Sequence, residues 1–253
     1  MAKIATDSQS LSRTGVKSAV RVMEVLEFFR RHNKPARAVE ISEMLDMPPS
    51  STDGLLKSLV DLAYLTFDAC TKQYAISMRT TRLCGALASS QLYNGRVNDA
   101  LQELTDQTNE TSALLIRNGR YMQFVAVMRG RVFCPQAHSE GTKCGLIETA
   151  AGRAWLSTKS NSEVIEIASQ ASLERHAPMA CSSYSPLIKT INEVRCSRFA
   201  FAELPTIPGY YAVAAPLPCS AARIPMVMGV ACPSPDLRDR FRRVLHTCME
   251  SIH

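Results

Sequence analysis

The sequence predicts an α+β protein of two domains: an N-terminal winged helix-turn-helix and a C-terminal domain of helices around a largely antiparallel sheet. Two observations carry this prediction. Between residues 37 and 77, two short amphipathic helices separated by a tight turn are followed by a β-prone hairpin. From residue 97 onward, helical and strand-like segments follow in the order typical of an α+β domain. The length of 253 residues is sufficient for two domains of ordinary size.

The composition is that of a globular protein with a core, because 46% of the residues are hydrophobic and 21% are charged. No apolar run approaches the roughly 20 residues that span a membrane. Residues 1–14 are polar and lack the apolar segment of a secretory signal. We therefore expect a disordered tail over 1–14, no membrane partner and a cytoplasmic location.

The winged helix-turn-helix is expected over residues 15–78. The first helix begins at Val16, and it ends near Arg30 and Arg31, whose charge suits a helix C-terminus. A second, short amphipathic helix stops at the turn 46–49, because the two prolines there cannot continue a helix. Prolines are well tolerated at the start of the next one.

A third helix opens at Ser50 and carries leucines on one side, after which the period of the pattern changes. Residues 64–67 and 74–76 are β-prone and flank a turn cluster, which predicts a hairpin. A hairpin directly after such a helix is a wing, and this unit typically lays its helix in the DNA major groove. A plain helical subdomain followed by a hairpin also fits the pattern.

The charge of the chain is compatible with a nucleic-acid partner, since the net charge is +6 and the pI is near 8.9. Residues 1–78 contribute little to it: ten Lys and Arg against nine Asp and Glu give a net of +1. Phosphate contacts therefore depend on the local placement of cations.

Residues 96–253 are expected to form the second domain, in which Asn118-Gly119 is a strong hairpin signal. The order of its elements predicts an α+β sensor domain. The expected helices are 97–108, 149–157, 162–171, 186–198 and 235–252. The expected strands are 112–117, 121–128, 131–137, 199–203, 211–218 and 224–232. Between the domains, residues 79–95 are interpreted as a linker helix that helps to pair subunits; an ordinary helix packed on its own domain fits equally well.

No catalytic, metal or cofactor site is assembled in the sequence. The nine cysteines are odd in number and form no Cys-x-x-Cys pair, which indicates mostly buried thiols rather than disulfides or zinc ligands. Cys134, His138 and Glu140 lie close in sequence, but strand geometry separates Cys134 and His138 by about 13 Å. Gly-rich phosphate loops and His-x-x-x-His patterns are absent. We expect no enzyme activity, no cofactor and no metal.

Five segments in the right order and spacing resemble the IclR-type bacterial transcription regulators, over nearly the whole chain. They are VKSAVRVMEVLEFF from residue 16, EISEMLDMPPSSTDGLLKSLVDLAYL at 40–65, LTDQTNET at 104–111, ETAAGRAWLS at 148–157 and GYYAVAAPLP at 209–218. The resemblance implies an N-terminal winged helix-turn-helix and a C-terminal GAF-like effector-binding domain. It implies a homodimer or homotetramer that binds double-stranded promoter DNA, senses a small carboxylate or aromatic metabolite and controls a catabolic operon. A pseudo-palindromic operator is expected from two-fold pairing.

The resemblance also implies DNA contacts around the third helix. Hydroxyls and amides at its start suit phosphates or base edges, although N-capping is an equal alternative for them. One departure concerns Gly54, which stands where the family usually has a basic residue. Glycine costs helix propensity and supplies no guanine-reading group, so a sensor that has lost DNA binding is the alternative function. The candidate DNA-binding residues are Arg37, Ser50, Ser51, Thr52, Asp53, Lys57 and Lys72.

In similar proteins, the effector pocket is lined by the start of the ETAAGRA helix and the last strands of the sheet. Most matching positions here are small, which leaves volume for a ligand or, alternatively, allows tight helix-on-sheet packing. Amides at the helix start suit a carboxylate. Two apolar departures, at Ile147 and at 216–218, favour an aromatic or hydrophobic acid over a small keto acid. The candidate effector-binding residues are Thr149, Ala150, Ala151, Glu203, Ala214, Gly229 and Ala231.

Overall fold

The computed structural model describes residues 16–80, 96–131, 139–173, 184–217 and 225–252. The chain divides into two compact units, Met1–Ser89 and Ser90–His253, and each is described by itself. Three expectations lie outside the described residues: the N-terminal tail, nearly all of the helix over 79–95, and nearly all of the strand over 131–137.

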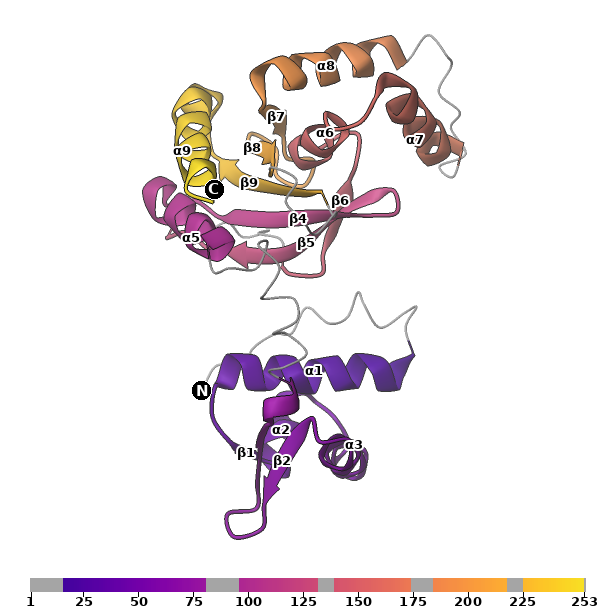
Figure 1. Ribbon diagram of the computed structural model, residues 1–253, viewed down its shortest axis with the longest axis vertical. Coiled ribbons are helices and arrows are strands. Elements are labelled where there is room, and N and C mark those ends of the chain that lie inside the picture. The colour runs from indigo at the N-terminus through magenta and orange to yellow at the C-terminus, as the bar shows by residue number, and fades with distance from the viewer. Residues whose placement is uncertain (1–15, 81–95, 132–138, 174–183, 218–224, 253) are drawn as a thin grey trace. The chain divides into compact units, whose positions relative to one another are not determined.

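Unit 1 is a winged helix-turn-helix, as the sequence predicts (Figure 1). Its three helices and small sheet enclose an apolar core that includes Val25, Phe29, Ile41, Leu56 and Leu59. These side chains recur at helical spacing, so each helix turns one face inward. The elements are α1 Lys17–His32, β1 Ala36–Arg37, α2 Ala38–Met44, α3 Pro49–Asp61, β2 Leu65–Asp68 and β3 Gln73–Ile76.

The turn between α2 and α3 is held by a serine and by its own backbone. Asp46 adopts a positive φ of 50°. Ser42 Oγ donates to Met47 O at 2.7 Å, and the Met47 N–H donates to Ser42 O at 3.0 Å. Pro49 occupies the first position of α3, where its missing N–H costs nothing. These contacts fix the direction in which α3 leaves the turn.

The wing is a three-stranded antiparallel sheet in the order β1-β3-β2. The predicted hairpin supplies β2 and β3, which pair Phe67 with Tyr74, and their rings lie 4.7 Å apart. Strand β1 is only two residues long and was not predicted from the sequence. It pairs Ala36 with Tyr74 and so ties the start of α2 to the wing.

Unit 2 is built on a six-stranded antiparallel sheet in the order β6-β5-β4-β9-β8-β7. Its strands are β4 Ser112–Asn118, β5 Tyr121–Met128, β6 Lys143–Gly145, β7 Ala200–Glu203, β8 Tyr211–Pro216 and β9 Met226–Cys232. Its helices are α5 Arg96–Thr108, α6 Ala150–Leu156, α7 Asn161–Leu173, α8 Tyr184–Ser197, the 3-10 turn η4 Pro235–Leu237 and α9 Arg238–Glu250.

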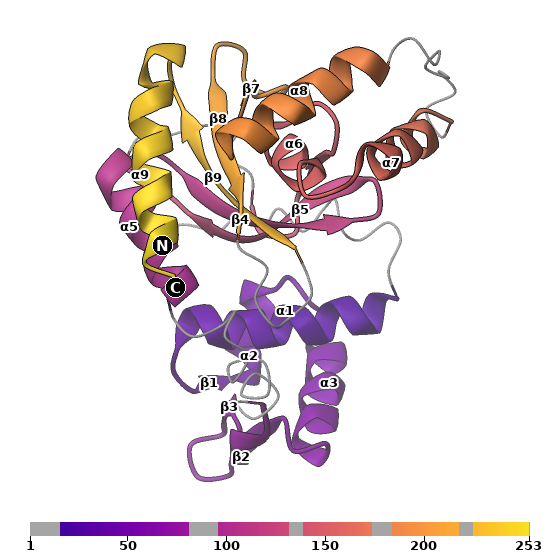
Figure 2. The ribbon, with the colours of Figure 1, turned by 45° about the horizontal axis from the view of Figure 1, so that its top comes forward.

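Helices cover both faces of this sheet (Figures 1 and 2). On one face, α6, α7 and α8 pack with side chains such as Leu115 and Val227. On the other face, α5 and α9 pack with Leu114, Met226 and Met228. Because side chains alternate along a strand, β4 and β9 contribute to both cores, and both strands are almost entirely buried.

The described helices and strands agree with the sequence predictions to within a few residues at their ends, and two differences are found. The three-residue strand β6 was not predicted, and the last helix begins as the 3-10 turn η4. In the described part of the chain, no helix has the length and apolar character required to cross a membrane.

Candidate functional site

The start of α3 presents two of its three predicted hydroxyls to solvent. Ser50 and Ser51 are exposed. Thr52 is fully buried, and its hydroxyl donates to Pro48 O at 3.1 Å. The N-cap residue is Pro48, so none of the three caps the helix in the predicted way. Thr52 supports the helix start from inside, and the Ser50 and Ser51 side chains remain available for a partner.

One turn further along α3, the predicted cation is engaged by an acid of the same helix. Lys57 Nζ lies 2.7 Å from Asp53 Oδ2. This hydrogen bond and the charge of Asp53 raise the pKa of Lys57. Gly54 is exposed, and a Cβ added there would meet no atom within 4 Å. With Asp53 and Asp61 against Lys57, the helix expected to read DNA carries a net negative charge.

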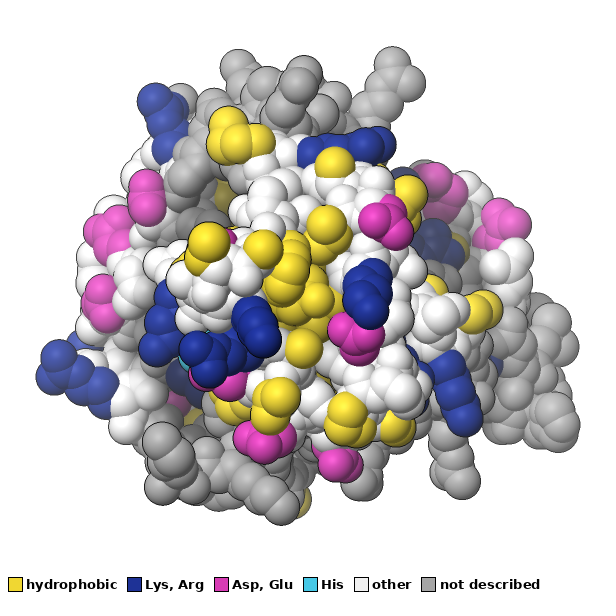
Figure 3. Space-filling view, turned by 90° about the horizontal axis from the view of Figure 1, so that it is seen from below, with side chains coloured by type: hydrophobic (Ala, Val, Ile, Leu, Met, Phe, Trp, Pro, Cys, Tyr) yellow, Lys and Arg dark blue, Asp and Glu magenta, His cyan; other side chains and the backbone are white. Residues whose placement is uncertain are grey.

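The two remaining DNA-binding candidates lie at the edges of unit 1. Arg37 is exposed at the N-cap of α2, where its backbone N–H donates to Glu40 Oε2 at 2.8 Å. Lys72 is exposed in the wing turn with a φ of 54°, beside Asp68, which accepts from Cys70 N–H and the Thr71 hydroxyl. Seen from the end of the molecule where α3 and the wing lie, acidic, basic and apolar side chains are mixed (Figure 3).

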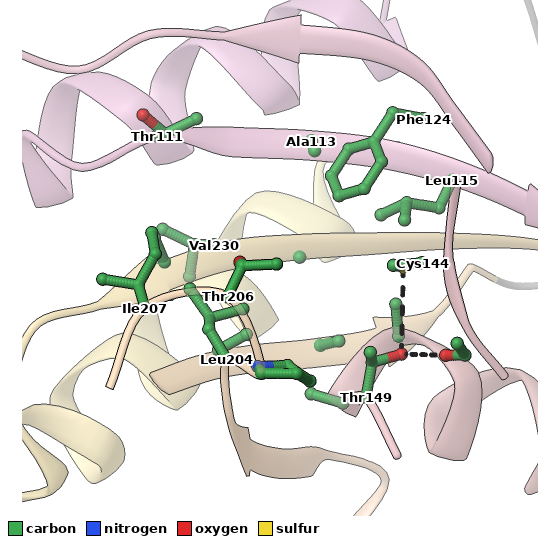
Figure 4. A pocket seen from close by; sticks show the side chains of 18 of the residues that line it. Thr111, Ala113, Leu115, Phe124, Cys144, Thr149, Leu204, Thr206, Ile207 and Val230 are labelled. Carbon is green, nitrogen blue, oxygen red and sulfur yellow. Dashed lines mark hydrogen bonds between the residues drawn. The ribbon is translucent and has the colours of Figure 1, made fainter. Parts of the chain in front are cut away.

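Unit 2 holds a pocket of about 290 Å³ on the sheet face that α6 covers (Figure 4). Its floor comes from β4, β8 and β9, and its rim comes from β6, the start of α6 and the loop after β7. The lining residues are Thr111, Ala113, Leu115, Phe124, Lys143, Cys144, Gly145, Thr149, Ala150, Ala151, Leu204, Pro205, Thr206, Ile207, Ala212, Ala214, Gly229, Val230 and Ala231.

The structure brings six of the seven predicted effector-binding residues to this pocket: Thr149, Ala150, Ala151, Ala214, Gly229 and Ala231. The seventh, Glu203, is exposed and does not line it. Its Oε1 accepts from the Gly209 N–H at 2.8 Å, and Gly209 has a φ of 79°. Glu203 therefore braces the loop that closes one side of the pocket.

Thr149 fixes the start of α6 at the pocket wall. Its Oγ1 donates to Gly145 O at 2.6 Å and accepts from the Gly152 N–H at 3.2 Å (Figure 4). Gly152 packs against the preceding loop so closely that an added Cβ would collide with Leu146 O. The seven-residue helix α6 is therefore clamped between its cap and this backbone contact.

Sequence reasoning missed Lys143, whose side chain alone carries a charge among the described residues that line the pocket. Lys143 lies on β6, a strand too short to recognise from its pattern. Also missed were the apolar walls, Leu115 and Phe124 from β4 and β5, and Leu204 and Ile207 from the loop after β7 (Figure 4).

The two departures that suggested an apolar pocket lie elsewhere. Ile147 does not line the pocket and packs at the edge of the core beneath α6. Leu217 belongs to the core on the opposite face of the sheet, and Pro216 does not line the pocket either. The pocket is apolar nonetheless, because of the side chains named above. Trp155, further along α6, is buried outside the lining, between the cations of Arg117 and Lys159.

The described cysteines offer no activated thiol. Burial raises the pKa of the pocket residue Cys144 to about 11, so its thiol stays protonated at neutral pH. Cys70 and Cys196 are exposed, contrary to the expectation of buried cysteines, while Cys232 and Cys248 are buried. Within the described residues, no group of three potential ligands is placed to hold a metal ion. Cys134 and His138 lie outside the described residues.

Similarity to known proteins agrees with this architecture. The regulator BhcR of Paracoccus denitrificans is 22% identical over 203 residues, which span 80% of this chain and 72% of BhcR. Pseudomonas aeruginosa HmgR has the same fold, with a TM-score of 0.59 at 19% identity over 94% of this chain and 97% of HmgR. An IclR homolog from Microbacterium hydrocarbonoxydans, solved in complex with 4-hydroxybenzoate, gives a TM-score of 0.56 at 15% identity over 93% and 97% of the two chains.

A winged helix-turn-helix followed by a domain with a small-molecule pocket defines a transcriptional regulator with an effector domain. Two family models identify it further. The IclR helix-turn-helix domain matches residues 18–69, and the C-terminal domain of the bacterial transcriptional regulator IclR matches residues 85–252. The chain belongs to the IclR family, whose members are transcriptional regulators and not enzymes.

Proposed function

We propose that this regulator binds promoter DNA as a homodimer or homotetramer through its winged helix-turn-helix, and that its C-terminal pocket senses a small organic acid. It acts in the cytoplasm on a catabolic operon. The acid is aromatic or otherwise hydrophobic rather than a small keto acid. The DNA contacts come from Arg37, Ser50, Ser51, Lys57 and Lys72.

The observation that carries the proposal is the lining of the pocket, which is apolar apart from a few polar groups and the cation of Lys143. Ligand pockets combine apolar walls with a small number of polar groups that orient the ligand. An ammonium group beside Leu115, Phe124 and Ile207 suits a carboxylate attached to an apolar body. A volume of about 290 Å³ is at the small end of ligand pockets, which favours a single ring.

Two further observations support this ligand class. The structural neighbour from Microbacterium hydrocarbonoxydans was crystallised with 4-hydroxybenzoate, an aromatic acid. In the pocket described here, lysine is a better anion partner than the amides of α6, because this helix has only seven residues and Thr149 already occupies the Gly152 N–H.

Calorimetric titration with aromatic acids, their uncharged amides, pyruvate and glyoxylate tests the pocket. We expect an aromatic acid to bind and its amide to bind at least tenfold more weakly. Lys143→Met removes the cation and is expected to weaken acid binding about tenfold, since a charge-assisted hydrogen bond contributes about 1.5–3 kcal/mol. Lys189→Met, which removes an exposed lysine of α8, is the matched control. Preferential binding of pyruvate or glyoxylate would contradict the proposed ligand class.

A sensor without DNA binding is the second candidate, favoured by the Asp53–Lys57 pair and by Gly54 in α3. Fluorescence anisotropy on duplexes tiled across the promoters flanking the gene, at two salt concentrations, separates the two candidates. A regulator binds one duplex selectively, loses affinity steeply with salt and responds to the acid found by calorimetry. If the acid binds but no duplex does, the second candidate is correct.

A further inference from the structure

Helix α9 concentrates positive charge on a surface of unit 2, away from the predicted DNA contacts. Four of its arginines fall within six residues: Arg238, Arg240, Arg242 and Arg243. All are exposed or half-buried. In the described part of the chain, none of the four guanidinium groups takes part in a hydrogen bond or an ion pair.

Cations on other helices are treated differently. Arg30 pairs with Glu27 at 2.7 Å, Lys57 pairs with Asp53 at 2.7 Å, and Lys159 lies 3.9 Å from Glu163. Each pair joins residues one helical turn apart. On α9, Asp239 precedes Arg243 by four residues, yet no ion pair between these two is present among the described contacts. The charge on α9 is therefore available to a partner.

Two of these arginines are held over aromatic rings. The Arg242 guanidinium lies 5.9 Å from the centre of the Phe199 ring, and Arg238 lies 5.4 Å from that of Phe201. The His246 ring is 6.1 Å from the Phe199 ring. Stacking on a ring restrains the planar guanidinium but leaves its edge N–H groups free to donate. The surface is thus organised as well as charged.

A groove of about 550 Å³ runs between the end of α8 and α9 at this position. Arg242, Arg243 and His246 supply its cationic side, and Ser197 and Thr247 add hydroxyls. Ser197 is engaged with the Phe199 backbone, donating to its carbonyl at 2.9 Å. The acid nearest to these groups along α9 is Glu250, which lies 3.5 Å from His246 Nδ1. No lining residue of this groove is shared with the effector pocket.

We propose that this groove binds a phosphate group. The planar fork of arginine matches phosphate oxygens, two adjacent forks surround the groove, and no carboxylate competes for Arg242 or Arg243 within the described residues. The phosphate comes either from a small phosphorylated metabolite or from the backbone of duplex DNA. Either source adds a second ligand to a protein whose effector is bound on the other face of the sheet.

Pyrophosphate is the probe for the first source. Calorimetry on the full chain is expected to detect binding that weakens with salt. Arg242→Gln/Arg243→Gln is expected to lose at least tenfold in affinity, since two charge-assisted contacts are removed. Arg240→Gln removes the same kind of charge from the same helix outside the groove and is expected to bind like wild type. Arg243→Gln alone, at an exposed position, reports an intermediate loss without risk to folding.

A duplex of arbitrary sequence is the probe for the second source. If α9 contacts the backbone, the double variant lowers the slope of log K against log salt by about 1.8, or 0.9 per phosphate contact. Pyrophosphate binding that the double variant loses identifies a small-molecule site, and a lowered slope identifies a DNA contact. The proposal is overturned if neither probe distinguishes the double variant from wild type, or if Arg240→Gln causes the same loss.

Discussion

Helices α3 and α6 each carry a glycine near their start, and the two glycines have opposite roles. A Cβ at Gly54 in α3 meets open space, whereas a Cβ at Gly152 in α6 collides with Leu146 O. The sequence gives no sign of this difference, because glycine lowers helix propensity equally at both positions. Gly152 is required by packing around the pocket. Gly54 is not required by packing, so its effect on function is through the side chain it lacks.

The same contrast holds for the lysines of the two regions. Lys57 on α3 is exposed and paired with Asp53, while Lys143 on β6 stands at an apolar pocket. A charge in an apolar, partly enclosed site interacts more strongly with a ligand than a charge in water. Effector binding is therefore built into unit 2 by enclosure. DNA binding by unit 1 depends on exposed groups that single substitutions can strengthen.

Gly152→Ala is the largest expected effect and tests the enclosed side of this comparison. The Cβ has to displace the Leu146 backbone, so we expect a loss of about 3 kcal/mol in the free energy of unfolding of unit 2. Trp155, the only tryptophan, reports this transition by fluorescence. Gly54→Ala is the control and is expected to stabilise unit 1 by about 1 kcal/mol. A Gly152→Ala protein as stable as wild type would mean that α6 is not clamped.

Gly54→Arg tests the exposed side. The side chain has room, and an arginine on this helix adds a cation to a surface of net negative charge. We expect promoter affinity to rise about tenfold, or about 1.4 kcal/mol, the scale of one added bidentate contact. Gly54→Gln matches the arginine in length and propensity without the charge. Equal affinities for Gly54→Arg and Gly54→Gln would show that α3 does not face DNA in this way.

Sequence reasoning succeeded where a pattern repeats and failed where chain segments meet. The leucines of α3 and the Asn118-Gly119 turn predict their elements because periodicity and turn chemistry are local. Six pocket residues were also found, but only through the family resemblance. Lys143 was missed because its role depends on pairing a three-residue strand with β5. The Asp53–Lys57 pair has the spacing of a helix ion pair and was open to prediction from the sequence.

Glu110→Gln extends the comparison from cations to acids. Glu110 is 4% exposed, and its Oε2 has no hydrogen-bond partner among the described residues. Burial raises the pKa of this carboxyl. The folded state therefore holds its proton more tightly than the unfolded state, and stability is lost as pH rises through the folded pKa.

The neutral amide avoids this loss, so we expect Glu110→Gln to stabilise unit 2 by about 1 kcal/mol at pH 7.5. The gain should vanish below the ordinary glutamate pKa of about 4.3, where the wild-type carboxyl is protonated in both states. Denaturant unfolding followed by Trp155 fluorescence at the two pH values measures it. A gain that is the same at both would assign the effect to packing instead of ionisation.

Asp53→Asn is the exposed counterpart and has the smallest expected effect on stability, because both partners of its ion pair are in water. Its effect should appear in DNA binding. Once Lys57 is released from Asp53, it can contact a phosphate, and the slope of log K against log salt should steepen by about 0.9. Asp61→Asn removes the same charge from the same helix without releasing a lysine. If both variants steepen the slope equally, the acids act on DNA only through repulsion, and the pairing of Lys57 has no separate role.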